Sequence, residues 1–184
     1  MAAALELFAE KAYGNTPVPQ IGERAGVATG TIYRYFESKE ALANAIYRDG
    51  KSTMAGLLPM GADTTALPDS PSPVWRAQFD RWWTGMWDFA VANPTMFAFL
   101  ETHHHAAYLD DESLAIASAI DGAAIDFIAA GQRAGVFRDG DPTAVLALAF
   151  GSFIGLTRVN LAVESNRAMS AGAAWNLLAD PSVD

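Results

Sequence analysis

The residues with the clearest metal-binding chemistry are three consecutive histidines, His103 to His105. Successive helical residues are turned by about 100°, so three in a row cannot share one face of a helix. Glu101 could pair with His104 or with His105, which supplies two ligands of a zinc site. A third ligand would have to come from another helix, and three aspartates are available: Asp88, Asp121 and Asp126. No motif for acid–base catalysis accompanies the run.

A second group of reactive side chains lies in Gly30–Lys39, GTIYRYFESK, which holds two tyrosines, an arginine and a lysine. The whole chain is acidic, with a formal net charge of −9. Residues 1–51 nevertheless carry six Lys/Arg and six Asp/Glu, so all the net negative charge falls in residues 52–184. Only the charge of the contacting face decides nucleic-acid binding, and the acidity therefore does not exclude it for the opening segment.

The composition of the chain indicates which class of protein positions the histidine run and the Gly30–Lys39 segment. The chain has 184 residues, of which 51% are hydrophobic, so it can bury a core without disulfides. It has no cysteine, which excludes cysteine-ligated zinc and cysteine nucleophiles. The N-terminus lacks the features of a signal peptide, and no apolar run is long enough to span a bilayer. We expect a cytoplasmic protein with no cofactor and no membrane partner.

Most segments show helical spacing, which predicts an all-α fold of about nine helices. A window with four prolines, residues 59–73, must interrupt the helices. Ser38 and Asp110 or Asp111 can cap helices, and Pro94 and Pro142 can begin them. The later expected helices cover Ala28–Phe36, Ser38 to Pro59, Val74–Ala92, Pro94–Tyr108, Asp111–Gly135, Pro142–Ser165 and a short segment from Ser170.

The segment around Gly26 predicts a helix-turn-helix. Gly26 can adopt a positive φ and end the helix expected over Val18–Ala25. Gly22 would allow the next helix to approach closely. The positions expected to form the small core are Ile21, Ala25, Val27, Ile32 and Tyr35. In this motif the second helix enters a DNA major groove.

The stretch ALELFAEKAYGNTPVPQIGERAGVATGTIYRYFESKEAL resembles the DNA-binding domain of the TetR family of bacterial transcriptional regulators. The resemblance covers about residues 2–48, and ERAGVATGTIYRYFESKEAL is its most specific part. It implies a DNA-binding domain over residues 1–48 and an effector-binding and dimerisation domain over residues 49–184.

The resemblance also implies roles for individual residues toward double-stranded operator DNA. Thr16 and Lys39 would contact DNA phosphates. The second helix of the motif would supply the remaining contacts to the DNA. The implied DNA-binding residues are Thr16, Thr29, Gly30, Thr31, Tyr33, Arg34, Tyr35 and Lys39. Family members usually carry a basic residue where this chain has Pro19, and a basic segment before the first helix. We expect correspondingly fewer phosphate contacts, or a start upstream of Met1.

The second half is dense in aromatic residues at helical spacing. These side chains could form a packed core, or they could line an effector pocket for an apolar or aromatic small molecule. The resemblance favours a pocket among these helices. The candidate ligand-binding residues are Phe79, Trp82, Trp83, Met86, Phe97, Leu100, His104, Tyr108, Phe127, Phe150 and Phe153.

The segment PTAVLALAFGSFIGLTRVNLAV, beginning at Pro142, is apolar nearly all round. A helix at the edge of a small bundle should carry a polar face, so both of its sides should be buried. Gly151 and Gly155 would allow close approach of another helix. A two-fold homodimer is the simplest source of that helix. The candidate interface residues are Val145, Leu148, Ser152, Leu156, Val159 and Trp175.

These observations predict a TetR-like homodimeric regulator, a repressor released by a small molecule, and not an enzyme. Two alternatives stay open: a metal-binding or enzymatic helical bundle that uses the histidine run, and a TetR-like protein that has lost DNA binding.

Overall fold

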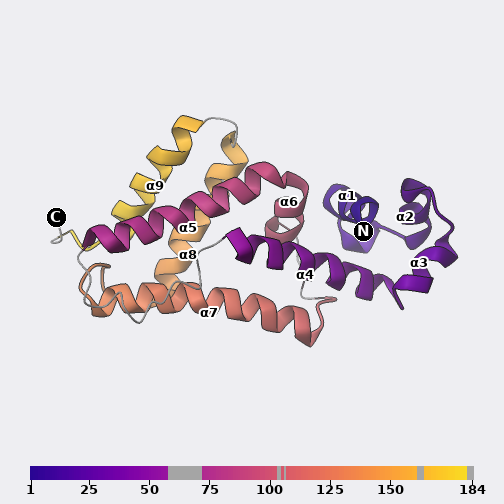
Figure 1. The fold of residues 1–184 in the computed structure, drawn as a ribbon, viewed down its shortest axis with the longest axis horizontal. Helices are drawn as coiled ribbons and strands as arrows, with labels where there is room; N and C mark the ends of the chain where they lie inside the picture. The colour runs from indigo at the N-terminus through magenta and orange to yellow at the C-terminus, as the bar shows by residue number, and fades with distance from the viewer. Residues whose placement is uncertain (58–71, 103–104, 106, 161–163, 182–184) are drawn as a thin grey trace. The chain divides into compact units, whose positions relative to one another are not determined.

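The structure is a computed structural model, and it describes residues 1–57, 72–102, 105, 107–160 and 164–181. Those residues form nine α-helices and one short 3-10 helix, and they contain no β-strand (Figure 1). The bounds are α1 (Ala2–Lys11), η1 (Tyr13–Asn15), α2 (Val18–Ala25), α3 (Thr29–Tyr35), α4 (Lys39–Leu57), α5 (Ser72–Ala92), α6 (Pro94–Thr102), α7 (Asp111–Arg133), α8 (Pro142–Asn160) and α9 (Glu164–Leu178). The predicted all-α fold is confirmed.

Two predicted helix caps are present. The backbone N–H of Ala41 donates to the Ser38 hydroxyl at 3.1 Å, and the N–H of Ser113 donates to Asp110 Oδ1 at 2.8 Å. These side chains satisfy donors that a helix start leaves open. Three bounds differ clearly from the prediction: α6 ends at Thr102, α8 ends at Asn160, and α9 begins at Glu164, before Ser170.

The chain divides into two compact units. The first unit contains Met1–Thr53 and Asn93–Ala117, and the second contains Met54–Ala92 and Ser118–Asp184. Helix α6 and the start of α7 therefore group with the N-terminal helices, although they lie far along the predicted second domain. Side-chain contacts explain the grouping, because α6 packs on α1 and its Phe99 ring stacks on Phe8 at 6.0 Å.

Polar contacts also hold the first unit together. Lys51 of α4 and Glu101 of α6 form an ion pair at 2.9 Å, and both side chains are about nine-tenths buried. Arg48 pairs with Asp110 at 2.8 Å. Asn44 donates to Tyr108 O at 2.8 Å, which fastens α4 to the segment between α6 and α7.

The second unit is built on aromatic side chains. Trp75, Phe79, Trp83 and Phe153 are completely buried. Phe153 of α8 meets the Trp83 ring of α5 edge-on at 5.2 Å, and Trp175 of α9 meets Phe79 at 5.6 Å. Edge-to-face contacts of this kind stabilise aromatic cores beyond the area they bury. Helices α5 and α8 each pack against α9.

Helix α7 qualifies by length and composition as a helix that could cross a membrane, and it is the one described helix that does. This differs from the expectation that no apolar run is long enough. A core helix of a soluble protein passes the same test, so the finding is weak evidence for a membrane span.

Candidate nucleic-acid interface

The turn between α2 and α3 has the geometry that the glycines predict. Gly26 ends α2 in the left-handed region, with φ 68° and ψ 28°, where a side chain would be strained. A Cβ on Gly22 would lie 2.8 Å from Val27 O, a distance that real Cβ atoms essentially never show. Both glycines are therefore needed for the tight corner that sets α3 against α2.

The small core beneath this turn is only partly filled. Ile21 and Ile32 are buried as predicted. Ala25 is exposed, Val27 is 41% exposed and Tyr35 is 77% exposed, so the prediction that these three form the core is wrong. All three lie where a helix ends or the chain turns: Ala25 ends α2, Val27 lies between the helices, and Tyr35 ends α3.

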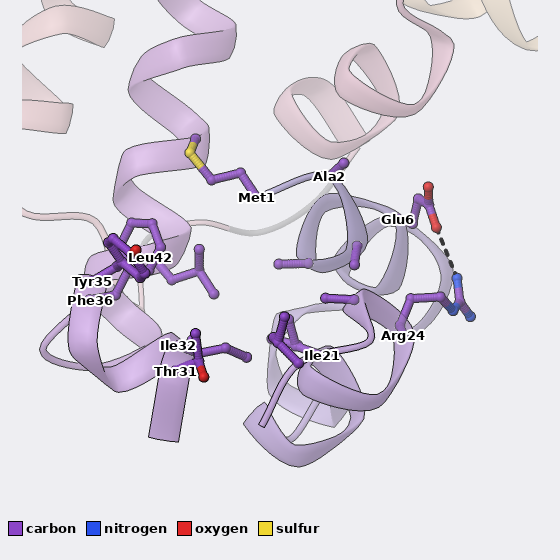
Figure 2. A pocket seen from close by; sticks show the side chains of 14 residues that line it. Met1, Ala2, Glu6, Ile21, Arg24, Thr31, Ile32, Tyr35, Phe36 and Leu42 are labelled. Carbon is purple, nitrogen blue, oxygen red and sulfur yellow. Dashed lines mark hydrogen bonds and ion pairs between the residues drawn. The ribbon is translucent and has the colours of Figure 1, made fainter. Parts of the chain in front are cut away.

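A cavity of about 530 Å³ lies beside this core (Figure 2). Its walls come from the start of α1, the end of α2, and α3 with the residues that follow it. Ala2, Ala3 and Ala4 face it with methyl groups only, while Tyr35, Phe36 and Leu42 line the opposite side. The small side chains of α1 leave the space that larger ones would fill.

Helix α3 presents two exposed stripes. Gly30, Tyr33 and Arg34 recur at helical spacing on one face, and Tyr33 is 51% exposed. Thr31 and Tyr35 share the neighbouring face and line the cavity. Thr29 is half-buried at the start of the helix. The first stripe combines hydrogen-bonding groups and a cation, and it has no large aliphatic side chain. Surfaces of this composition are suited to contact the phosphates and base edges of a DNA groove.

Thr16 is not placed as predicted. Its side chain is completely buried, and its hydroxyl lies 2.9 Å from Ala12 O and 3.2 Å from Leu7 O. Leu7 lies within the second half of α1, and Ala12 is the residue after the helix. The hydroxyl closes this end of the helix, so it is not exposed to a phosphate.

Lys39 is also engaged within the protein. Its ammonium donates to Tyr13 O at 2.9 Å and to Thr16 O at 3.2 Å, and it lies 4.1 Å from the centre of the Tyr13 ring. The hydroxyl of Tyr13 donates to Glu40 Oε1 at 2.5 Å. This bond lowers the pKa of the Glu40 carboxyl, and burial is the main cause that raises the pKa of Tyr13. Sequence reasoning did not single out Tyr13.

The predicted ligand-binding residues fall in both units. Phe97, Leu100 and Tyr108 are buried in the first unit, and His104 lies outside the described residues. In the second unit most are buried in the aromatic core, while Phe127 and Phe150 are half-buried. The second-unit members are Phe79, Trp82, Trp83, Met86, Phe127, Phe150 and Phe153. Ligand binding by any of them stays a prediction.

Trp75 is a further residue of that core with a polar group. Its indole N–H is buried and has no hydrogen-bond partner among the described residues. Its ring contacts Phe127 at 5.4 Å and Phe137 at 5.8 Å. The dense aromatic spacing of α5 was the sequence signal, but nothing in the sequence distinguishes Trp75 from its neighbours.

The exposed face of α8 overlaps the predicted interface only in part. Val145 is buried in its own chain, as is Trp175 of α9, so neither is available to a second copy. Leu148 is 72% exposed, Ser152 and Leu156 are half-buried, and the side chain of Val159 lies outside the described residues. The docking of Phe153 onto Trp83 and Trp87 fixes which side of α8 turns inward.

Between Ala144 and Gly155 the exposed face of α8 is apolar and made of small residues around Leu148. Added Cβ atoms on Gly151 and Gly155 would meet no atom within 4 Å, so this stripe has no partner among the described residues. The stripe contains Ala144, Ala147, Leu148, Gly151 and Gly155. Helix α9 adds two exposed apolar side chains, Met169 and Leu177.

His105 is the member of the histidine run that the structure describes. Its Nε2 lies 3.2 Å from Leu100 O, and its Nδ1 is hydrogen-bonded with the Tyr108 hydroxyl. Both ring nitrogens thus have protein partners. Among the described residues no three His, Asp or Glu side chains are grouped as metal ligands, and His103 and His104 are not part of that set.

The turn geometry, the exposed polar stripe of α3 and the helical second unit define a helix-turn-helix DNA-binding protein with a separate helical bundle. Comparison with known families agrees. Residues 1–46 match the model of bacterial regulatory proteins of the TetR family, and residues 65–169 match that of the tetracyclin repressor-like C-terminal domain. The chain belongs to the TetR family of transcription regulators.

Individual relatives are more distant. The chain is 43% identical over 47 residues to the fatty acid metabolism regulator protein of Bacillus subtilis (strain 168), a match that covers 26% of this chain and 24% of that protein. A TetR family transcription regulator from Marinobacter aquaeolei VT8 has a similar structure, with a TM-score of 0.75 at 20% identity, covering 97% of this chain and 93% of that one. A regulatory protein of the TetR family from Rhodococcus RHA1 gives 0.72 at 22% identity, covering 96% and 93%. At these identities the structures support the fold alone.

Proposed function

We propose that this protein is a homodimeric repressor that acts in the cytoplasm, binds operator DNA through α3 and is released by a small molecule. The observation that carries the DNA-binding part is the exposed stripe of Gly30, Tyr33 and Arg34 on the second helix of the motif. Thr29, Thr31 and Tyr35 stand beside this stripe and complete the proposed DNA-facing set. Arg34 is the one long cation in it, and it can donate to a base edge or to a phosphate.

The dimer is supported by the apolar stripe of α8. Monomeric proteins rarely leave a contiguous apolar face uncovered, and the small residues at Gly151 and Gly155 would let a second helix come close. Met169 and Leu177 of α9 extend the same kind of surface. A second copy of the chain supplies a matching apolar face by symmetry.

The effector is proposed to be apolar or aromatic and to carry a hydrogen-bond acceptor. The aromatic core of the second unit provides flat apolar contacts, and the unpartnered indole N–H of Trp75 could bind the acceptor. By linkage, an effector that weakens DNA binding must itself bind more weakly to the DNA complex, by the same factor.

A mobility-shift titration with duplex DNA from upstream of the protein's own gene tests the proposal. The wild-type protein should bind, the affinity should fall steeply with salt, and Tyr33→Ala should weaken it. No shift at low salt would contradict the DNA-binding function and favour a family member that has lost DNA binding.

A further inference from the structure

The corner between α1 and α2 is strained. Ala12 has φ 65° and ψ 157°, and it is the one non-glycine residue with a positive φ in the described part of the chain. This region of backbone space is used almost only by glycine, and other residues adopt it where surrounding contacts hold them there. Something nearby must therefore fix the segment from Ala12 to Thr16.

The fixing contacts come from two sides. From within the segment, the Thr16 hydroxyl reaches Ala12 O and Leu7 O. From outside, the first two residues of α4 hold Tyr13, and the Tyr108 ring stacks on the Tyr13 ring at 4.0 Å. The Lys39 ammonium donates a hydrogen bond to the Tyr13 carbonyl and lies over the Tyr13 ring. The Glu40 carboxylate accepts a hydrogen bond from the Tyr13 hydroxyl.

These contacts join residues that lie on either side of the helix-turn-helix in the chain. Thr16 lies just before α2, and Lys39 begins α4 just after α3. The bonds from Lys39 to Tyr13 O and Thr16 O therefore join the two ends of the segment that contains the whole helix-turn-helix. A lysine has three N–H donors, and two of them are already used.

We propose that Lys39 is a positioning residue, which pins the strained Ala12–Thr16 corner to the start of α4 and so fixes where α2 and α3 meet DNA. This inference rests on the proposed DNA-binding function. It differs from the implied role of Lys39 as a plain phosphate contact, because a plain contact would leave the DNA-free protein unchanged when the ammonium is removed.

The test compares Lys39→Met with a matched control, Lys11→Met, whose ammonium instead donates to the exposed Gln20 side chain. Amide hydrogen exchange is measured on the full-length DNA-free proteins. In Lys39→Met the amides of Asn15 and Thr16, which donate to Ala12 O and Tyr13 O, should exchange roughly tenfold faster. Lys11→Met should exchange like the wild type at these two amides.

DNA affinity is then measured as a function of salt with the upstream duplex. Lys39→Met should bind roughly tenfold more weakly than Lys11→Met. Tyr13→Phe removes only the hydroxyl bond to Glu40, so it should weaken binding less, with an unchanged salt slope. This second variant keeps the test valid if Lys39→Met folds poorly.

Unchanged exchange in Lys39→Met, with a salt slope lower by about one, would assign Lys39 to a phosphate and overturn the inference. Faster exchange with full DNA affinity would make the contact structural only, which also overturns it. Failure of the wild-type protein to bind DNA would contradict the proposed function instead, and the exchange data would still show whether Lys39 pins the corner.

Discussion

Helices α3 and α8 both leave a face exposed, and the two faces differ in chemistry and in support. The face of α3 carries tyrosine and arginine side chains, and it rests on a partly filled core with a cavity. The face of α8 carries alanine, leucine and glycine, and it rests on buried aromatic rings. The chemistry of the two faces is the basis of the proposed partners, a nucleic acid for α3 and a second copy of the chain for α8.

The largest expected effect comes from placing a charge on the α8 face. Leu148→Arg should weaken dimerisation roughly hundredfold, because the guanidinium would have to be buried in an apolar contact. Sedimentation velocity measures the change. Val91→Arg is the matched control, since Val91 is an exposed apolar residue of α5 at 51% exposure. A Leu148→Arg protein that stays dimeric would remove α8 from the interface.

On the α3 face, the expected effects are comparable or smaller, and they are of two kinds. Arg34→Ala and Tyr33→Ala should each weaken DNA binding by about 1–3 kcal/mol. If Arg34 contacts a phosphate, its loss also lowers the salt slope by about one, whereas Tyr33→Ala leaves the slope unchanged. Fluorescence anisotropy at several salt concentrations separates these outcomes. Wild-type affinity in both variants would mean that this stripe does not face DNA.

The strained corner between α1 and α2 gives a stability prediction. Ala12→Gly should raise the free energy of unfolding by about 1 kcal/mol, because relief of the positive-φ strain exceeds the entropy that glycine loses on folding. Ala9→Gly, within the regular α1 helix, is the control and should be destabilising. Chemical denaturation measures both, and a destabilised Ala12→Gly would show that the corner is not strained.

Filling the cavity beside the α3 core is also expected to raise the stability of the protein. Ala3→Leu places a larger side chain on the cavity wall, and we expect it to stabilise the protein by about 1 kcal/mol. Ala43→Leu is the contrasting variant, since Ala43 is completely buried and a larger side chain there should destabilise. Thermal unfolding measures the stability of both variants. A destabilised Ala3→Leu would mean that the space is needed by the native packing.

The smallest effect concerns pH, and it follows from the polar contacts of the first unit. Hydrogen bonds from Ser113, followed by the pairing with Arg48, hold the pKa of Asp110 below its ordinary value of 3.8. A carboxyl with a lowered pKa contributes stability above pH 3.8, and this contribution is lost as the pH falls through the folded-state value. Asp110→Asn keeps a capping oxygen and removes the charge.

Melting temperatures at pH 6 and pH 3 should therefore differ less in Asp110→Asn than in the wild type. A variant with the wild-type difference would assign the acid sensitivity to other carboxylates. The described carboxyls with a lowered pKa, Glu10, Glu40 and Asp110, all lie in the first unit, so we expect the acid response to come mainly from that unit.

Local signals in the sequence predicted the helix-turn-helix well. Gly22, Gly26 and the Ser38 cap each act through backbone geometry within a few residues, so their roles follow from the sequence. Side-chain direction was harder to predict. Tyr35 was expected inside and is exposed, and Thr16 was expected outside and is buried, because tertiary contacts decide how a short segment is rotated.

The orientation of the whole helix α8 was also hard to predict from the sequence. The helix is apolar nearly all round, so its sequence does not state which side turns inward. Contacts of Phe153 with the tryptophans of α5 make that choice, and they bury Val145 while leaving Leu148 exposed. The grouping of α6 with the N-terminal helices likewise depends on contacts between distant segments, such as Lys51 with Glu101.

The most direct test of the central claim is the stoichiometry of the DNA complex, measured by sedimentation equilibrium with the upstream duplex at low salt. We expect an even number of chains for each duplex, with two at a single site, and loss of this complex in Leu148→Arg. One chain bound with wild-type affinity, or no binding at all, would contradict a dimeric DNA-binding regulator.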